Sequence, residues 1–69
     1  MYKVELFDKW GQTQKVVSKV VGTPKVGHGM KKVSPGVYDN MEDIVVAFGR
    51  TQAEAEKKAK ARWNKLLNY

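Results

Sequence analysis

The sequence predicts an α+β domain in which an antiparallel three-stranded sheet carries one C-terminal helix on one face, in the order β-β-loop-β-α. Three observations support this class: alternating apolar residues over 2–10, an apolar run over 44–48, and a helix-capping signal that precedes helical spacing over 51–67. With 69 residues, the chain has room for a single domain, residues 1–69, with a thin core.

The first two strands are predicted to form a hairpin. Tyr2, Val4 and Leu6 alternate with charged residues over 2–10, as in a half-buried strand, and Gly11-Gln12 is a plausible tight turn. Residues 13–21 follow as the second strand, with valine on both of its faces. This pattern indicates either a central strand or an interface on the second face.

Residues 22–36 contain four glycines, both prolines and three lysines, which break any regular period. We expect this segment to be a flexible basic loop that either contacts a partner or serves as a mobile connection. In an alternative four-stranded sheet, Lys25-Val26 pairs with Lys32-Val33 across Gly27-His28-Gly29.

The third strand and the helix have the clearest local signals. Residues 42–48 alternate between two apolar faces, and Gly49-Arg50 ends the strand. Thr51 and Glu54 match a capping box, in which each side chain bonds the backbone amide of the other residue. The apolar residues Ala55, Ala59, Trp63, Leu66 and Leu67 then fall on one side of a helix, while its basic residues, Arg62 among them, form a solvated surface.

The composition excludes several classes of site. The chain has no cysteine and one histidine, so disulfides and thiolate metal sites are absent and no metal or other cofactor is expected. His28 lies between glycines with nothing to fix its geometry, so we expect no enzymatic activity. The sequence also lacks a run that could cross a membrane and the layout of a signal peptide, which predicts a cytoplasmic protein without membrane contact.

The net charge is +6, and it is unevenly distributed, because residues 9–38 contain six lysines and no acidic residue. Such a block favours polyanions, although positive charge also keeps a small protein soluble. The candidate partner-binding residues are five cations for phosphate or acidic groups and two aromatic anchors: Lys19, Lys25, Lys31, Lys32, Arg50, Trp10 and Tyr38. The three residues Asp39, Glu42 and Asp43 fit an acidic turn before a strand.

Residues 42–67 resemble two nucleic-acid-binding modules. Glu56-Lys-Lys-Ala-Lys60 is similar to the helix of the C-terminal half of double-stranded-RNA-binding domains, and Phe48-Gly-Arg-Thr51-Gln-Ala-Glu54-Ala55 to the helix entry of the arm-type DNA-binding domains of phage integrases, with one extra residue between Phe and Thr. Both resemblances imply that the sheet face and residues 22–36 bind nucleic acid. By size and charge, the chain also resembles small phage-encoded inhibitors such as anti-CRISPR proteins, which imply a protein partner.

The sequence is therefore compatible with two functions. One is a non-catalytic protein that contacts DNA or RNA phosphates, or a host nucleic-acid-binding protein complex, through the lysine-rich segment and the sheet face. The other is a protein-binding inhibitor or homodimeric adaptor, for which Val17 and Val21 on the outer side of the second strand would matter more than the lysines.

Overall fold

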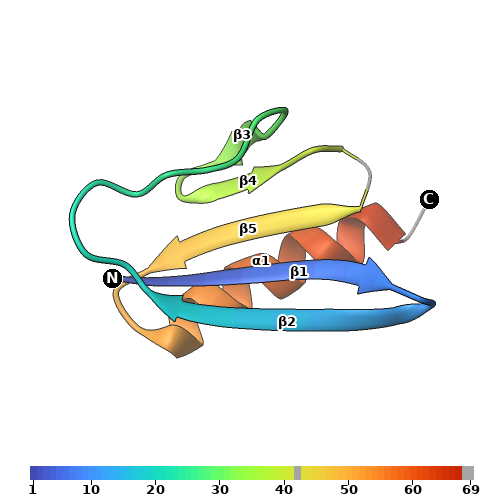
Figure 1. Ribbon diagram of the computed structural model, residues 1–69, viewed down its shortest axis with the longest axis horizontal. Coiled ribbons are helices and arrows are strands. Elements are labelled where there is room, and N and C mark those ends of the chain that lie inside the picture. The colour runs from blue at the N-terminus through green and yellow to red at the C-terminus, as the bar shows by residue number, and fades with distance from the viewer. Residues whose placement is uncertain (42, 68–69) are drawn as a thin grey trace.

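A computed structural model describes residues 1–41 and 43–67. The described elements, in chain order, are β1 (Tyr2–Lys9), β2 (Gln12–Lys19), β3 (Lys31–Ser34), β4 (Val37–Asp39), β5 (Ile44–Gly49) and α1 (Gln52–Leu67) (Figure 1). The predicted α+β class and the single C-terminal helix on one face are therefore confirmed, but the sheet has five strands instead of three or four. Glu42, expected to start the last strand, lies outside the described residues.

All neighbouring strands in the sheet are antiparallel, in the spatial order β2-β1-β5-β4-β3. The β1–β2 hairpin closes through Trp10 and Gly11, whose φ angles of 54° and 77° are both positive. Two-residue hairpin loops favour such angles, because their twist matches that of the strands. The predicted hairpin is thus correct, with its turn one residue earlier than Gly11-Gln12.

The segment 22–36 contains a strand, although its glycines and prolines favoured a loop. Residues 31–34 form β3, and Pro35-Gly36 turns the chain into β4, with a φ of 73° at Gly36. Lys25 and Val26 are in no strand, so the alternative pairing of these residues with Lys32-Val33 is wrong. The reason is that the turn forms at Pro-Gly, where proline presets φ and glycine accepts a positive φ.

The helix starts as its capping signal predicts, with one difference. The Thr51 hydroxyl accepts a hydrogen bond from the Glu54 amide at 3.1 Å, but the Glu54 carboxylate accepts one from the Arg50 amide, at 3.3 Å, instead of from Thr51. Gly49 allows this close entry, since a Cβ at that position would lie 2.7 Å from the Ala55 nitrogen. The backbone amides of Arg50 and Glu54 are thereby both satisfied.

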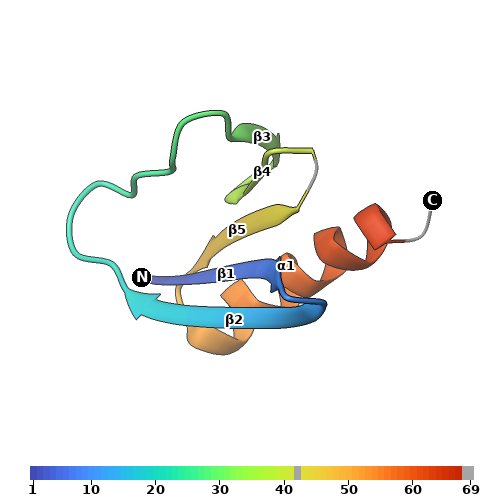
Figure 2. The same cartoon turned by 45° about the vertical axis from the view of Figure 1, so that its right-hand side comes forward.

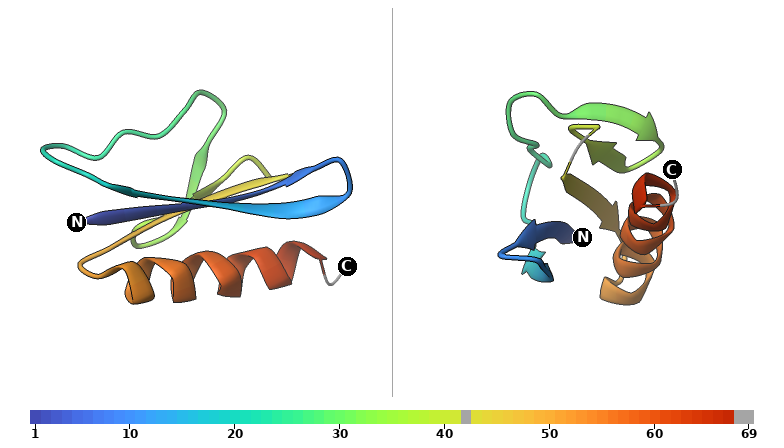
Figure 3. Two further views of the ribbon diagram at one scale, coloured as in Figure 1. Left: turned by 60° about the horizontal axis from the view of Figure 1, so that its bottom comes forward. Right: turned by 90° about the vertical axis from the view of Figure 1, so that its right-hand side faces the viewer.

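The main core lies between α1 and strands β1 and β5 (Figure 3). Val4 and Leu6 of β1 lie opposite Ala47 and Val45 of β5, and all four are buried against the helix. From the helix, the small residues Ala55 and Ala59 permit close approach, and Trp63 fills the far end, as the sequence predicted. Val17 lies opposite Val4 and packs against the same core, so its predicted place on the outer side of the second strand is wrong.

The outer face, meaning the side of the sheet away from α1, is partly covered. The connection over residues 20–30 leaves β2 and returns at β3 (Figure 2), and Figure 3 shows it on the side of the sheet opposite the helix. Val46 and Phe48 lie on this outer face, yet each is only 5% exposed. At the β2 edge of the outer face, Val16 stays accessible, with 45% of its surface exposed.

Candidate nucleic-acid interface

Among the described acidic residues, four form ion pairs: Glu5, Asp39, Glu54 and Glu56. Five of the basic side chains lie within ion-pair distance of an aspartate or glutamate: Lys3, Lys15, Lys58, Lys60 and Arg62. Within residues 1–41 and 43–67, none of the remaining eight has an acidic partner: Lys9, Lys19, Lys25, Lys31, Lys32, Arg50, Lys57 and Lys65. All five predicted cations are in the second group, so their charge is available to an external anion.

The two glutamates of the first helical turns show how the paired charges are arranged. The pKa of Glu54 lies below its usual value because Lys58 and the Arg50 amide donate hydrogen bonds to the carboxylate. The pKa of Glu56 is lowered in the same way by Lys15, at 2.7 Å, and by Lys60, at 3.2 Å. Lys15 comes from β2, so Glu56 links the helix to an edge of the sheet.

The predicted cations fall into two groups rather than one patch. Lys19 lies opposite Tyr2, and Tyr2 lies opposite Gly49, so the register places Lys19 and Arg50 at the same end of the sheet, near the start of α1. Lys25 is in the connection that extends from this end (Figure 1).

Lys31 and Lys32 form the second group, on the edge strand β3. Lys32 lies opposite Tyr38 on the outer face. Lys31 lies opposite Asp39, whose carboxylate contacts α1, so Lys31 is on the helix side. A single strand therefore presents positive charge on both faces of the sheet.

The two predicted aromatic anchors are in different environments. Tyr38 is half-buried and packs edge-on against Phe48, with ring centroids 6.0 Å apart at 84°. Trp10 at the β1–β2 turn is 93% exposed, with the Lys9 ammonium 5.3 Å from the ring centroid. Tyr38 thus packs within the protein on the outer face of the sheet, whereas Trp10 is accessible to a partner.

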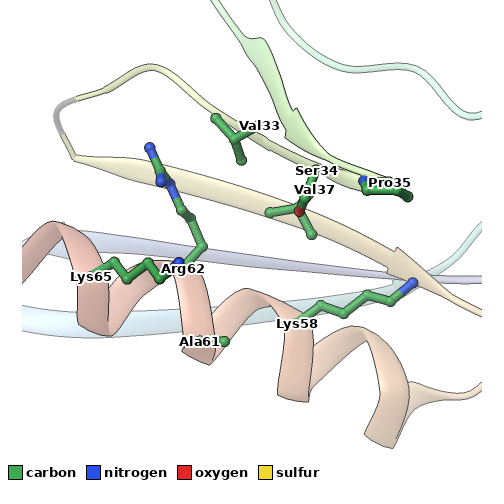
Figure 4. Close-up of a pocket in the computed structure, with 8 residues that line it drawn as sticks. All are labelled: Val33, Ser34, Pro35, Val37, Lys58, Ala61, Arg62 and Lys65. Carbon is green, nitrogen blue, oxygen red and sulfur yellow. The ribbon is translucent and has the colours of Figure 1, made fainter.

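A groove that the sequence did not predict lies between the β3–β4 hairpin and α1 (Figure 4). Its volume is about 430 Å³, and its lining combines apolar strand residues with helix cations: Val33, Ser34, Pro35, Val37, Lys58, Ala61, Arg62 and Lys65. The spacing of Lys58, Arg62 and Lys65 at helical intervals was the available signal, but only the added hairpin makes the surface concave.

Two of the three cations in this groove already have acidic partners. Arg62 pairs with the fully buried Asp39, which also accepts a hydrogen bond from the Met41 amide at 3.0 Å. Lys58 lies 3.3 Å from Glu54 and donates to the Phe48 carbonyl at 3.3 Å. Only Lys65 is unpaired among the described groove residues, so the groove itself attracts anions weakly. The assignment of Arg62 to a solvated surface, and of Asp39 to a turn, is wrong, since together they form the buried link between strand and helix.

Among the described residues, the structure gives no candidate metal centre. His28 is exposed in the connection, and no three histidine or acidic side chains within 1–41 and 43–67 are grouped so that they could hold a metal ion. None of the helices in the described part of the chain is long and apolar enough to span a membrane. The comparisons with known proteins returned no matching family model, curated protein or solved structure.

Proposed function

We propose that this protein is a non-catalytic binder of nucleic-acid backbone. The observation that carries the proposal is the division of its charges: Glu5, Asp39, Glu54 and Glu56 pair with five helix and strand cations, and eight basic residues have no acidic partner among the described residues. Such unpaired surface cations contact phosphates with release of counterions.

The distribution of these cations favours phosphate contacts over base-edge contacts. They are mostly lysines, which lie on both faces of edge strand β3 and at the end of the sheet near the start of α1, and they form no compact set aimed at one groove. Lysine acts as a point charge without the planar fork that arginine uses to recognise guanine. The expected binding is therefore independent of sequence and strongly dependent on salt.

A salt titration tests this proposal. We expect the affinity for a short DNA duplex, measured by fluorescence anisotropy, to fall steeply between about 50 and 200 mM salt. The double variant Lys31→Ala/Lys32→Ala should bind more weakly, with a salt slope that is smaller by about 0.9 for each phosphate that the variant no longer neutralises.

The matched control is Lys15→Ala/Lys60→Ala, which removes the same two charges from lysines that are paired with Glu56. This control should retain more affinity than the β3 variant, because the paired lysines are less available to phosphate. A flat salt response of the unmodified protein rules out the proposal. Equal losses of affinity in both variants would show that binding depends on the net charge of the protein and not on the unpaired lysines of β3.

A second candidate function is that of a protein-binding inhibitor or homodimeric adaptor. The observation that favours it is the exposure of two valines, Val16 in edge strand β2, at 45%, and Val21 just after this strand, at 90%. In that case, Val16→Ser with Val21→Ser should abolish self-association or partner binding, and the β3 lysines should matter little. Capture of a partner that survives nuclease treatment, together with dissociation by the valine variant, would favour this function.

A further inference from the structure

The turn position of Trp10 is unfavourable for a tryptophan, both in its backbone conformation and in its exposure to solvent. It is the first residue of the β1–β2 turn, with a φ of 54°, where asparagine, aspartate or glycine is favoured because larger side chains crowd the backbone. Its side chain is 93% exposed, so the strain is not offset by burial. The other tryptophan, Trp63, is 6% exposed and fills the core, as the residue type usually does.

The contacts that Trp10 makes inside the protein are few. The only ring contact that the described residues give it is with Lys9, whose ammonium lies 5.3 Å from the ring centroid. Such contacts are weak at exposed sites. An exposed, rigid aromatic residue in a strained turn is therefore explained by an external partner rather than by folding.

The surroundings of Trp10 indicate the chemistry of that partner. A shallow hollow of about 410 Å³ is lined by Trp10, Lys9, Gln12 and Gln14. The register places Gln12 opposite Lys9, and Gln14 opposite Phe7, on the outer face of the hairpin. The hollow thus combines one π surface, one cation and two amide side chains, which suit a nucleotide better than an apolar protein anchor.

We propose that Trp10 stacks on an unpaired nucleobase, with Lys9 contacting the adjoining phosphate and Gln12 and Gln14 within reach of the base edge. This inference rests on the proposed function and narrows it to single-stranded nucleic acid or unpaired ends. Phe7, half-buried on the same face, continues the aromatic surface along β1. Stacking tolerates any base, since every base has a π face.

The test compares a fluorescein-labelled oligothymidylate with a blunt-ended DNA duplex of the same length, at low salt, by anisotropy. The variant Trp10→Asn removes the ring and suits the positive φ of the turn, so it should fold at least as stably as the unmodified chain. We expect its affinity for oligothymidylate to fall by about 5- to 150-fold, from the measured range for base–aromatic stacking. Its affinity for the duplex should change less than about twofold, because phosphate contacts are retained.

Two further variants serve as controls. Trp10→Phe keeps an aromatic ring and should restore much of the oligothymidylate affinity. Leu67→Asn changes another exposed apolar residue, 59% exposed at the end of α1, and should have no effect. Oligothymidylate should also quench the emission of Trp10 and spare that of buried Trp63, so that quenching is abolished in Trp10→Asn.

The outcomes separate this inference from the proposed function. If Trp10→Asn binds both DNA forms as the unmodified protein does, or loses affinity equally for both, stacking is refuted and backbone binding stands. If the unmodified protein binds neither form, both proposals fail together. If the affinity of Trp10→Phe for oligothymidylate is no higher than that of Trp10→Asn, the aromatic ring is not the group that contacts the base.

Discussion

The ion pair between Arg62 and Asp39 gives the sharpest test of the packing between strand and helix. Asp39 is the one charged residue that is fully buried within the described part of the chain, and Arg62 is its only charged partner there. In Arg62→Met, a side chain of similar length remains, but among the described residues the carboxylate keeps only the Met41 amide as a donor. Leaving a buried charge unpaired costs about 3–5 kcal/mol.

That loss is large for a protein of this size. At about 0.05–0.15 kcal/mol per residue, a chain of 69 residues has a free energy of unfolding of about 3–10 kcal/mol. At the lower end of this range Arg62→Met should be largely unfolded in water, and at the upper end it should unfold at a much lower urea concentration than the unmodified protein. The double variant Asp39→Asn/Arg62→Met should regain much of the stability, because no buried charge is left without a partner.

Urea unfolding followed by far-ultraviolet circular dichroism measures these differences. The control is Lys65→Met, which changes an exposed cation on the same helix that has no acidic partner among the described residues, and it should shift the free energy of unfolding by less than about 0.5 kcal/mol. If Arg62→Met loses less than about 1 kcal/mol, the reasoning is refuted, since an unpaired buried carboxylate cannot be that well tolerated.

Three other predictions concern the same unfolding measurement. Gly49→Ala should destabilise the protein by about 1–3 kcal/mol, because the added Cβ would lie 2.7 Å from a helix nitrogen, whereas Gly27→Ala meets nothing within 4 Å and should have little effect. Trp63→Ala should cost about 3–5 kcal/mol through the cavity it leaves; a smaller loss would mean that the core collapses around it. The lowered pKa values of Glu54 and Glu56 mean that the folded state binds protons more weakly than the unfolded state, so their stabilisation is present above the unfolded-state pKa and is lost as the pH falls through the folded-state value. Glu54→Gln/Glu56→Gln should flatten this acid dependence, and an unchanged slope would show that other carboxylates cause it.

Local signals were sufficient for the parts of the fold that local chemistry specifies. The alternation along β1, the glycine at the β1–β2 turn and the Thr51–Glu54 cap each act within a few residues, so the hairpin and the helix could be predicted. The β3–β4 hairpin could not, since strands of four and three residues are too short to show a period. There, the Pro35-Gly36 turn and pairing with β5 outweigh the composition of the segment.

The candidate site, like the fold, has features that the sequence predicts and features that only the tertiary structure determines. The sequence alone identified a block of lysines without acids and a tryptophan near a turn, because charge and residue type need no neighbours to be recognised. Only the tertiary structure decided which cations are neutralised, since Arg62 meets Asp39 across 23 positions of the chain and Lys15 meets Glu56 across 41. Folding also covers Phe48 and leaves Trp10 in water, because burial depends on how the sheet, helix and connection pack together, and not on the hydrophobicity of either residue.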